Sequence, residues 1–200
     1  MRRYIRPLLI IFLIIAIDQL IKIWIKANLY LGDEIPLISD KFVIHFTENN
    51  GMAFGFEFGG YYGKLILSLF RIVAVSFIGY ALFRLIRQRY PQGLIICVSM
   101  ILAGAIGNII DSTFYGVAYG YADLFYGRVV DMFYAPLFTG VFPDWMPLWA
   151  GEEFLFFRPV FNFADASISV GVFVILLFQK TFFREPLPIV LTTNDEVEEE

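Results

Sequence analysis

The chain has 200 residues, of which 58% are hydrophobic and 17% are charged, and its mean hydropathy is +0.69. A soluble domain carries charge on about a quarter of its residues, so this composition excludes an ordinary soluble protein and predicts a membrane protein. The formal net charge of −4 gives no indication of nucleic-acid binding.

Four apolar segments are predicted to cross the membrane, because each crossing takes about 20 apolar residues. The predicted spans are residues of about 8–27, 64–84, 93–113 and 163–180. Arginines precede the first span as in a signal peptide, but no small-residue cleavage pattern follows it, which favours retention. The predicted fold class is an all-α membrane protein, with one four-helix domain over residues 1–185.

Three segments outside the spans have distinct compositions. Residues of about 33–60 alternate in places and contain several glycines, which predicts a small extramembrane β segment after the first helix. Residues of about 114–160 are predicted to form a long outer loop before the fourth helix. Its aromatic side chains favour the membrane boundary, so we interpret 132–159 as a flap, with simple surface packing as the alternative. Residues 186–200 form an acidic tail that we expect to be disordered and cytoplasmic.

Cationic clusters flank the spans on one side of the predicted bundle. They consist of Arg2, Arg3 and Arg6, then Arg84, Arg87 and Arg89, and finally Lys180 and Arg184. Because such clusters stay in the cytoplasm, both termini are predicted to be cytoplasmic, and the segments after the first and third spans are predicted to face outside.

Polar side chains are predicted to gather at the outer ends of the third and fourth spans. Asn108 and Asp111 are spaced i and i+3 and therefore share one helical face. Asn162 and Asp165 lie at the start of the fourth span, and Asp131 lies in the segment between the two spans. Each of these residues alone has a structural interpretation, such as a helix cap. Together they predict a functional site at one depth, because polar groups in a membrane are costly.

Other polar residues have simpler interpretations. Asp18 and Lys22 are predicted to form an ion pair within the first span. Arg71 could pair with one of the site acids or extend to the interface, and the sequence leaves both open. His45 has no companion at a metal-ligand spacing, and Cys97 has no partner for a disulfide, so no metal site is predicted.

Five motifs resemble those of the lipoprotein signal peptidases, also called signal peptidase II. In chain order they are residues 18–22 (DQLIK, similar to D-Q-x-x-K), 49–54 (NNGMAF, similar to N-x-G-x-A-F), 107–111 (GNIID, similar to G-N-x-x-D), 127–131 (GRVVD, similar to G-x-V-V-D) and 161–165 (FNFAD, similar to F-N-x-A-D). Each motif alone is weakly specific. Five in order over nearly the whole chain are highly specific.

The resemblance implies an aspartic endopeptidase whose catalytic pair is Asp131 and Asp165. The supporting active-site residues that it implies are Asn49, Gly51, Asn108, Asp111, Asn162, Asp18 and Lys22. The implied substrate is a diacylglyceryl-modified prolipoprotein, cut just before its lipid-modified lipobox cysteine. The implied location is the bacterial inner membrane, with the active site at the outer face. Expected partners are this substrate and membrane lipid, with no metal or cofactor and a monomeric chain.

The chain departs from the family pattern in two places. Relatives often carry Arg directly after the aspartate of the third span, whereas this chain has Ser112. The sequence leaves open whether this chain forms the ion pair that such an Arg makes in the relatives. The outer segments on either side of Asp131 are also longer than expected, although the motifs are intact.

The predicted chemistry follows from two adjacent carboxylates, which cannot both ionise cheaply and therefore share a proton. One then acts as base toward a water molecule and the other as acid toward the scissile carbonyl. The sequence shows no histidine or lysine placed to activate Ser112, Ser167 or Ser169 as a nucleophile. Two alternatives remain, namely a small proton-coupled membrane carrier, since buried acids also build proton relays, and a noncatalytic scaffold. A carrier is expected to show repeated halves, which this sequence lacks.

Overall fold

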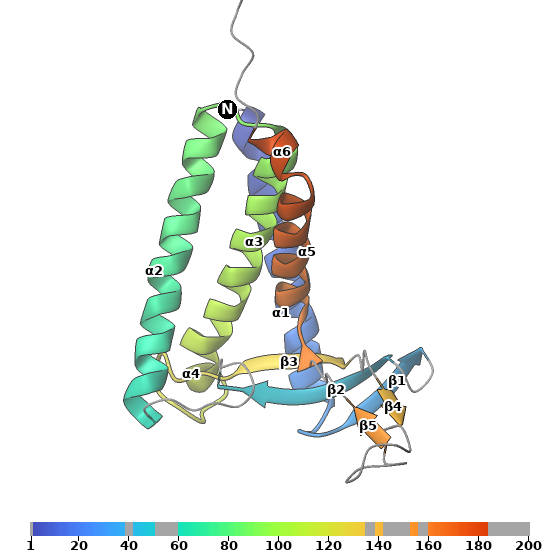
Figure 1. Cartoon of the computed structure of the whole chain (residues 1–200). Coiled ribbons are helices and arrows are strands. Elements are labelled where there is room, and N and C mark those ends of the chain that lie inside the picture. Colours follow the sequence, from blue (N-terminus) through green and yellow to red (C-terminus); the bar gives the residue numbers. More distant parts are fainter. Residues whose placement is uncertain are drawn as a thin grey trace, which may run out of the picture.

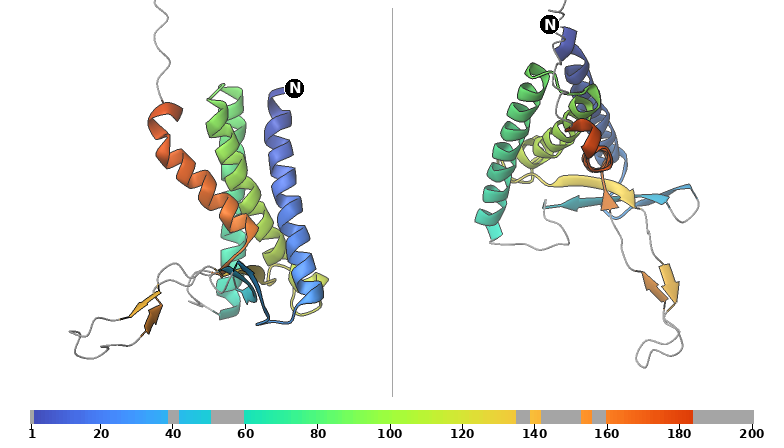
Figure 2. Two further views of the ribbon diagram at one scale, coloured as in Figure 1. Left: turned by 90° about the vertical axis from the view of Figure 1, so that its right-hand side faces the viewer. Right: turned by 45° about the horizontal axis from the view of Figure 1, so that its top comes forward.

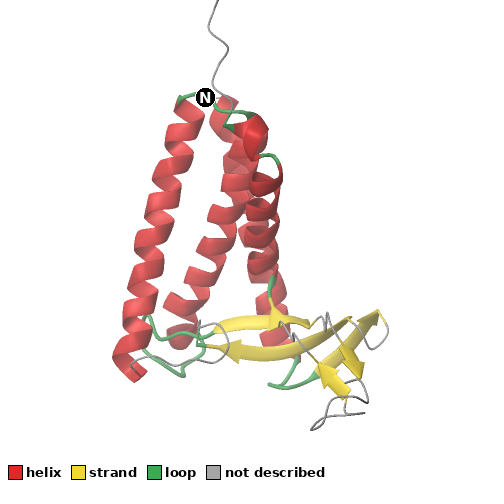
Figure 3. Cartoon of the chain, in the orientation of Figure 1, coloured by secondary structure: helices red, strands yellow, loops and turns green. Residues whose placement is uncertain are grey.

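Four apolar helices stand side by side, and a small antiparallel sheet lies across one end of them (Figure 1). The computed structural model describes residues 2–38, 42–50, 60–134, 139–141, 153–155 and 160–183. Figure 3 shows that helices and strands separate into two layers. The N-terminus and the short last helix α6 (Gln179–Phe182) lie at the end opposite the sheet.

The long helices are apolar around their whole circumference, which is typical of helices surrounded by lipid. They are α1 (Arg2–Asn28), α2 (Gly60–Arg87), α3 (Gln92–Ile110) and α5 (Phe163–Leu177). Large side chains such as Phe12, Phe70, Phe77 and Phe173 are exposed on their surfaces. Within the described residues, three segments are long and apolar enough to cross a membrane, namely Arg3–Asn28, Tyr62–Arg87 and Gln92–Ala118. The 15-residue α5 is shorter than the predicted fourth span.

The third helix does not end where the sequence predicts. It continues through a π-helical turn, η2 (Asp111–Tyr115), into the short α4 (Gly116–Ala118). The strand that follows is reached through Gly127, whose backbone nitrogen donates to the Ser112 carbonyl at 2.9 Å. A Cβ atom at Gly127 would lie 2.1 Å from the Asp111 carbonyl oxygen, so this approach requires glycine. The π turn thus holds the chain against the end of α3.

The main sheet joins two segments that are distant in sequence. Its strand order is β1 (Glu34–Ile38), β2 (Phe42–Asn49), β3 (Val129–Tyr134) and β6 (Val160–Phe161), and all neighbours are antiparallel. Thr47 pairs with Asp131 across the central strands. Two further strands, β4 (Thr139–Val141) and β5 (Glu153–Leu155), pair into a hairpin that projects away from the helices (Figure 2).

The sheet corrects the predicted division into a β segment and a loop. The predicted β segment, 33–60, contains β1 and β2, but α2 already begins at Gly60. The predicted loop, 114–160, begins with helix and contains three strands and the start of a fourth, β6. The sequence missed β3 because its first four residues are all buried, which removes the alternation that marks a half-exposed strand. Most of the aromatic segment interpreted as a flap lies outside the described residues.

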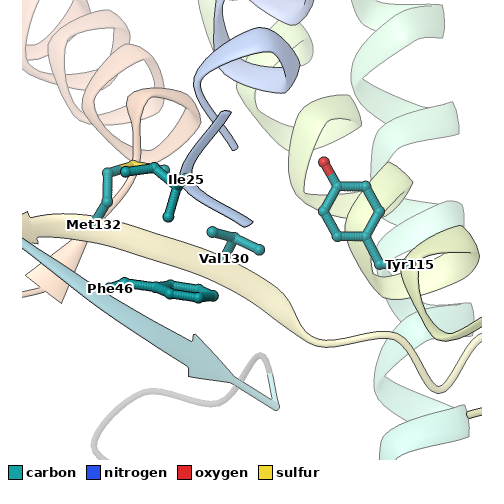
Figure 4. Packing of buried hydrophobic residues seen from close by; sticks show 5 residues of the cluster. All are labelled: Ile25, Phe46, Tyr115, Val130 and Met132. Carbon is teal, nitrogen blue, oxygen red and sulfur yellow. The ribbon is translucent and has the colours of Figure 1, made fainter. Parts of the chain in front are cut away.

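A hydrophobic cluster fixes the sheet to the helices. Its buried members are Ile25, Phe46, Tyr115, Val130 and Met132. Figure 4 shows the side chains from α1, β2 and β3 gathered at the end of α1, with Tyr115 approaching from the α3 extension. A second cluster, of Leu82, Ile86, Ile95 and Leu102, joins α2 to α3 nearer the other end. Cys97 is buried in a third cluster and therefore serves as core packing.

Candidate active site

The structure brings the predicted polar residues together where the helices meet the sheet. Asp131 lies on β3, directly before the buried Met132. Asn108 lies in the last turn of α3, and Asn162 and Asp165 open α5. Asn49 ends β2 and its side chain hydrogen-bonds to Asp131. Gly51 lies outside the described residues.

Two side-chain amides bridge the two carboxylates that the motifs single out. The Asn162 Nδ2 atom donates to Asp131 Oδ1 at 2.7 Å and to Asn108 Oδ1 at 3.1 Å. The Asn108 Nδ2 atom in turn donates to Asp165 Oδ1 at 2.8 Å. This chain of hydrogen bonds fixes both carboxylates relative to each other.

Asp165 also takes part in a helix cap, the structural role that the sequence suggested for such a residue on its own. Its backbone nitrogen donates to Asn162 Oδ1 at 2.9 Å, and the Asn162 backbone nitrogen donates to Asp165 Oδ2 at 3.4 Å. This reciprocal capping box satisfies two free donors of the first helical turn. The cap therefore holds both residues at the start of α5, where the helix dipole favours negative charge.

Asp131 lies in a poorly hydrated position, because only 4% of its surface is exposed. Burial raises the pKa of Asp131 to about 7, and the negative charge of nearby Asp165 acts in the same direction. Hydrogen bonds from Asn162 and Asn49 and the charge of Lys22 oppose that rise. Asp131 can therefore exchange a proton near neutral pH, as a general acid or base must.

A buried ion network lies beneath the two carboxylates. The fully buried Lys22 Nζ atom lies 2.8 Å from Asp18 Oδ2 and 2.8 Å from Asp111 Oδ2. It also donates to Asn108 Oδ1 at 3.1 Å. The predicted ion pair between Asp18 and Lys22 is thus confirmed, and Lys22 connects it to the amides of the site.

Both acids of this network hold the backbone next to a motif aspartate. Asp111 Oδ2 accepts from the Val130 backbone nitrogen at 3.2 Å, one residue before Asp131. Asp18 Oδ1 accepts from the Ala164 backbone nitrogen at 2.9 Å, one residue before Asp165. A Cβ atom at Gly107 would lie 2.7 Å from Asp18 Oδ2, so glycine at this position lets α1 approach α3.

Sequence reasoning gave no role to two members of the network. The Gln19 Nε2 atom donates to Asp111 Oδ1 at 2.9 Å and to the Gly107 carbonyl at 3.2 Å. Tyr115 donates its hydroxyl hydrogen to Gln19 Oε1, with 3.1 Å between the two oxygens. Gln19 could have been predicted as a site residue, because it is part of the DQLIK motif. Nothing in the sequence indicates Tyr115, because its position depends on the π turn.

The partner of Arg71, which the sequence left open, includes Ser112. The Arg71 Nη1 atom donates to Ser112 Oγ at 2.9 Å, and Ser112 Oγ donates to the Asn108 carbonyl at 3.0 Å. Ser112 is the residue at which the chain departs from the family pattern. A guanidinium group from α2 therefore lies beside this position.

The described residues contain no group of three or more His, Cys, Asp or Glu side chains placed to hold a metal ion. His45 instead places its Nδ1 atom 3.0 Å from Glu34 Oε1, at the edge of the sheet. The side chains that converge at the site are carboxylates, amides and cations. They suit proton transfer and the activation of a water molecule.

The fold and site together define a helical membrane protein in which two carboxylates, bridged by side-chain amides, lie at one end of the helices. The model of the family described as Signal peptidase (SPase) II matches residues 10–182. The chain belongs to this family, and it is accordingly a peptidase.

Known proteins support the assignment over most of the chain. A lipoprotein signal peptidase of Porphyromonas gingivalis is 50% identical over 184 residues, which cover 84% of this chain and 80% of that protein. A lipoprotein signal peptidase of Amoebophilus asiaticus is 38% identical over 187 residues, which cover 89% of this chain and 79% of that protein. A solved structure described as a bacterial membrane enzyme is 26% identical, with a TM-score of 0.60, and the match covers 87% of this chain and 92% of that one.

Proposed function

We propose that the chain removes signal peptides from diacylglyceryl-modified prolipoproteins, with Asp131 and Asp165 as an aspartic catalytic pair. The family and the relatives that are named lipoprotein signal peptidases support this function. The observation that carries the mechanism is the amide bridge, in which Asn162 and Asn108 connect the two carboxylates. Cleavage is expected just before the lipid-modified lipobox cysteine.

In the proposed mechanism the two carboxylates share one proton. Asp131 holds the proton, because its pKa is raised to about 7 by burial and by Asp165. Asp165, in the first turn of α5, acts as the base and removes a proton from a water molecule between the two residues. Asp131 donates its proton to the scissile carbonyl oxygen, which produces a tetrahedral intermediate without a covalent acyl-enzyme.

The supporting residues would act by holding this pair in place. Asn49, Asn108 and Asn162 orient the carboxylates through hydrogen bonds. Lys22 forms ion pairs with both Asp18 and Asp111, and these acids fix the backbone ahead of each catalytic residue. Gly51 is proposed as a supporting residue from the motif at 49–54 alone.

The proposed topology places the sheet outside the cytoplasm. The apolar helices and the bacterial relatives support a multi-pass protein of the bacterial inner membrane. We further propose four spans in a single domain over residues 1–185, a monomer, and two cytoplasmic termini. The two ends of the described chain lie at the end of the helices opposite the sheet, which fits an even number of spans (Figures 1 and 2). The active site would then face the outer leaflet and its lipid.

The aromatic segment 132–159 is proposed to act as an interfacial flap. It begins within β3, directly after Asp131, and ends before β6, which leads to Asn162. Its position is therefore coupled to both halves of the site. A flap of this kind would exclude water and guide the lipid-anchored substrate.

The membrane-carrier alternative is not favoured, because the family and the relatives are peptidases. A cleavage assay tests the proposal directly. The purified full-length protein would be incubated with a lipobox peptide that carries a diacylglyceryl cysteine, and with the same peptide lacking the lipid. We expect cleavage before the cysteine of the lipidated peptide only. Equal cleavage of both peptides would remove the lipid from the proposed specificity, and cleavage of neither would overturn the function.

A further inference from the structure

Arg71 is a cation within an apolar helix that faces lipid over much of its length. Neighbouring side chains on α2, such as Ile66, Phe70 and Val73, are exposed. Arg71 is only partly exposed, and its Nη1 atom lies 2.9 Å from Ser112 Oγ at the start of the π turn. One turn earlier, Ser68 Oγ donates to the Phe125 carbonyl at 2.9 Å. These two contacts turn this part of α2 toward the site and away from lipid.

The position of Arg71 exposes the catalytic pair to its charge. The guanidinium group interacts electrostatically with Asp165, Asp131 and Asp111. Asp111 already has Lys22 at 2.8 Å. Asp131 and Asp165 therefore experience the positive charge of Arg71, whereas Lys22 is held between Asp18 and Asp111.

Building on the proposed function, we propose that Arg71 is a positioning residue whose charge, held in place by Ser112, keeps one carboxylate of the pair ionised. It would contact neither the substrate nor the reacting atoms. Among the described residues, the other charged groups around the pair are Asp18 and Lys22 of α1 and Asp111 at the end of α3. Two of these three groups are acids, and Lys22 is paired with both of them, so Arg71 is a second source of positive charge for the pair.

The direction of the expected pH effect follows from the sign of the charge. A positive charge stabilises the ionised forms of nearby carboxylates, so its removal makes each proton of the pair harder to lose. Both limbs of the pH profile of kcat/KM should therefore move to higher pH when Arg71 is neutralised. We expect a shift of about half to one pH unit for the loss of one nearby positive charge.

The experiment compares pH profiles of the purified full-length protein on a diacylated lipobox peptide. Arg71→Gln should shift both limbs upward, and Arg71→Lys, which keeps the charge, should leave them near the parental positions. Ser112→Ala keeps the charge but removes its anchor, so we expect a smaller shift in the same direction. Arg84→Gln is the matched control, because it removes the same charge from the far end of α2 and should leave the profile unchanged.

The outcomes separate this inference from the proposed function. An Arg71→Gln variant that is slower or has a higher KM, with both limbs in place, would show a packing or substrate-binding role and would overturn the inference. If that variant does not insert into membranes, unchanged limbs in Ser112→Ala would overturn it instead. Failure of the parental protein to cleave the lipidated peptide would be a failure of the proposed function.

Discussion

The proposed catalytic pair consists of Asp131 and Asp165. The best test is therefore to replace each residue by one of the same shape. Asp131→Asn and Asp165→Asn keep the size of each side chain but remove its ability to exchange a proton. We expect each variant to lower the cleavage rate by at least about 100-fold, the lower limit of what a positioned acid or base contributes.

The matched control for these variants is Asp123→Asn, because Asp123 is exposed and lies in the segment before β3. It should cleave at the parental rate. All three proteins should insert into membranes in equal amounts, as judged by immunoblotting of washed membranes. Near-parental cleavage by either variant would exclude that residue from the catalytic pair.

The raised pKa of Asp131 also predicts a dependence of stability on pH. Because its pKa is about 7 in the folded protein and 3.8 without the fold, the folded state binds the proton more tightly. The stability gained from this proton is fully present below pH 3.8 and is lost as the pH rises through 7. Asp131→Asn removes the buried carboxylate, so it should raise the thermal unfolding temperature above that of the parent under alkaline conditions.

That advantage of Asp131→Asn should shrink as the pH falls below about 7, because the parental carboxyl then becomes neutral as well. The measurement is thermal unfolding of the purified proteins in detergent across this range. Asp123→Asn again provides the comparison, and its difference from the parent should not follow this titration. A constant difference between Asp131→Asn and the parent at all pH values would contradict the burial argument.

Individual residues also show how far the sequence could predict the site. Asp131 and Asp165 could be proposed as the catalytic pair from the motifs, because each closes a motif of the family. The contacts that hold these two side chains in place could not be predicted, because such contacts depend on how the helices and the sheet pack. Arg71 meets a serine 41 positions away, and Tyr115 reaches Gln19 only through the π turn.

At the scale of elements, the sequence predicted helices better than strands. The helices have long apolar runs, which are recognisable without knowing what surrounds them. The β2–β3 pairing joins Thr47 to Asp131 and Asn49 to Val129, and no local pattern indicates such partners. The end of α3 was also missed, because the π turn begins with the polar residues Asp111, Ser112 and Thr113, so the apolar run of the sequence stops before the helical structure does.

The junction between the π turn and β3 gives a prediction about element packing. Gly127→Ala would place a Cβ atom 2.1 Å from the Asp111 carbonyl oxygen, and backbone on both sides prevents relief. We expect a loss of stability on the order of 3 kcal/mol, at the upper end of typical overpacking costs. Cleavage should fall as well, because Gly127 leads into the strand that carries Asp131.

The control for Gly127→Ala is Gly79→Ala, since a Cβ atom at Gly79 on α2 would meet nothing within 4 Å. Alanine favours a helix interior by up to about 1 kcal/mol relative to glycine, so this variant should be as stable as the parent or slightly more stable. Thermal unfolding and peptide cleavage would be measured for both proteins. Equal behaviour of the two variants would show that the β3 junction is looser than the structure indicates.

At the scale of the whole molecule, the distribution of charge and the fold indicate the same polarity. The basic last turn of α2 contains Arg84 and Arg87 and lies at the end of the helices opposite the sheet. Cationic residues beside spans stay in the cytoplasm, so this end is expected to be cytoplasmic. The sheet and the catalytic pair would then lie where exported precursors emerge.

Labelling of single cysteines tests this polarity. Cys97 is the only cysteine of the chain and is buried, so a Cys97→Ala background is free of thiols. Gln88→Cys and Asp123→Cys place new thiols at exposed positions at opposite ends of the helices. In spheroplasts, a membrane-impermeant maleimide should label Asp123→Cys and not Gln88→Cys, because only the sheet end is predicted to face outside.

After the membrane is permeabilised, both should react equally, which controls for accessibility. Labelling of Gln88→Cys in sealed spheroplasts, with protection of Asp123→Cys, would invert the topology and place the catalytic pair in the cytoplasm.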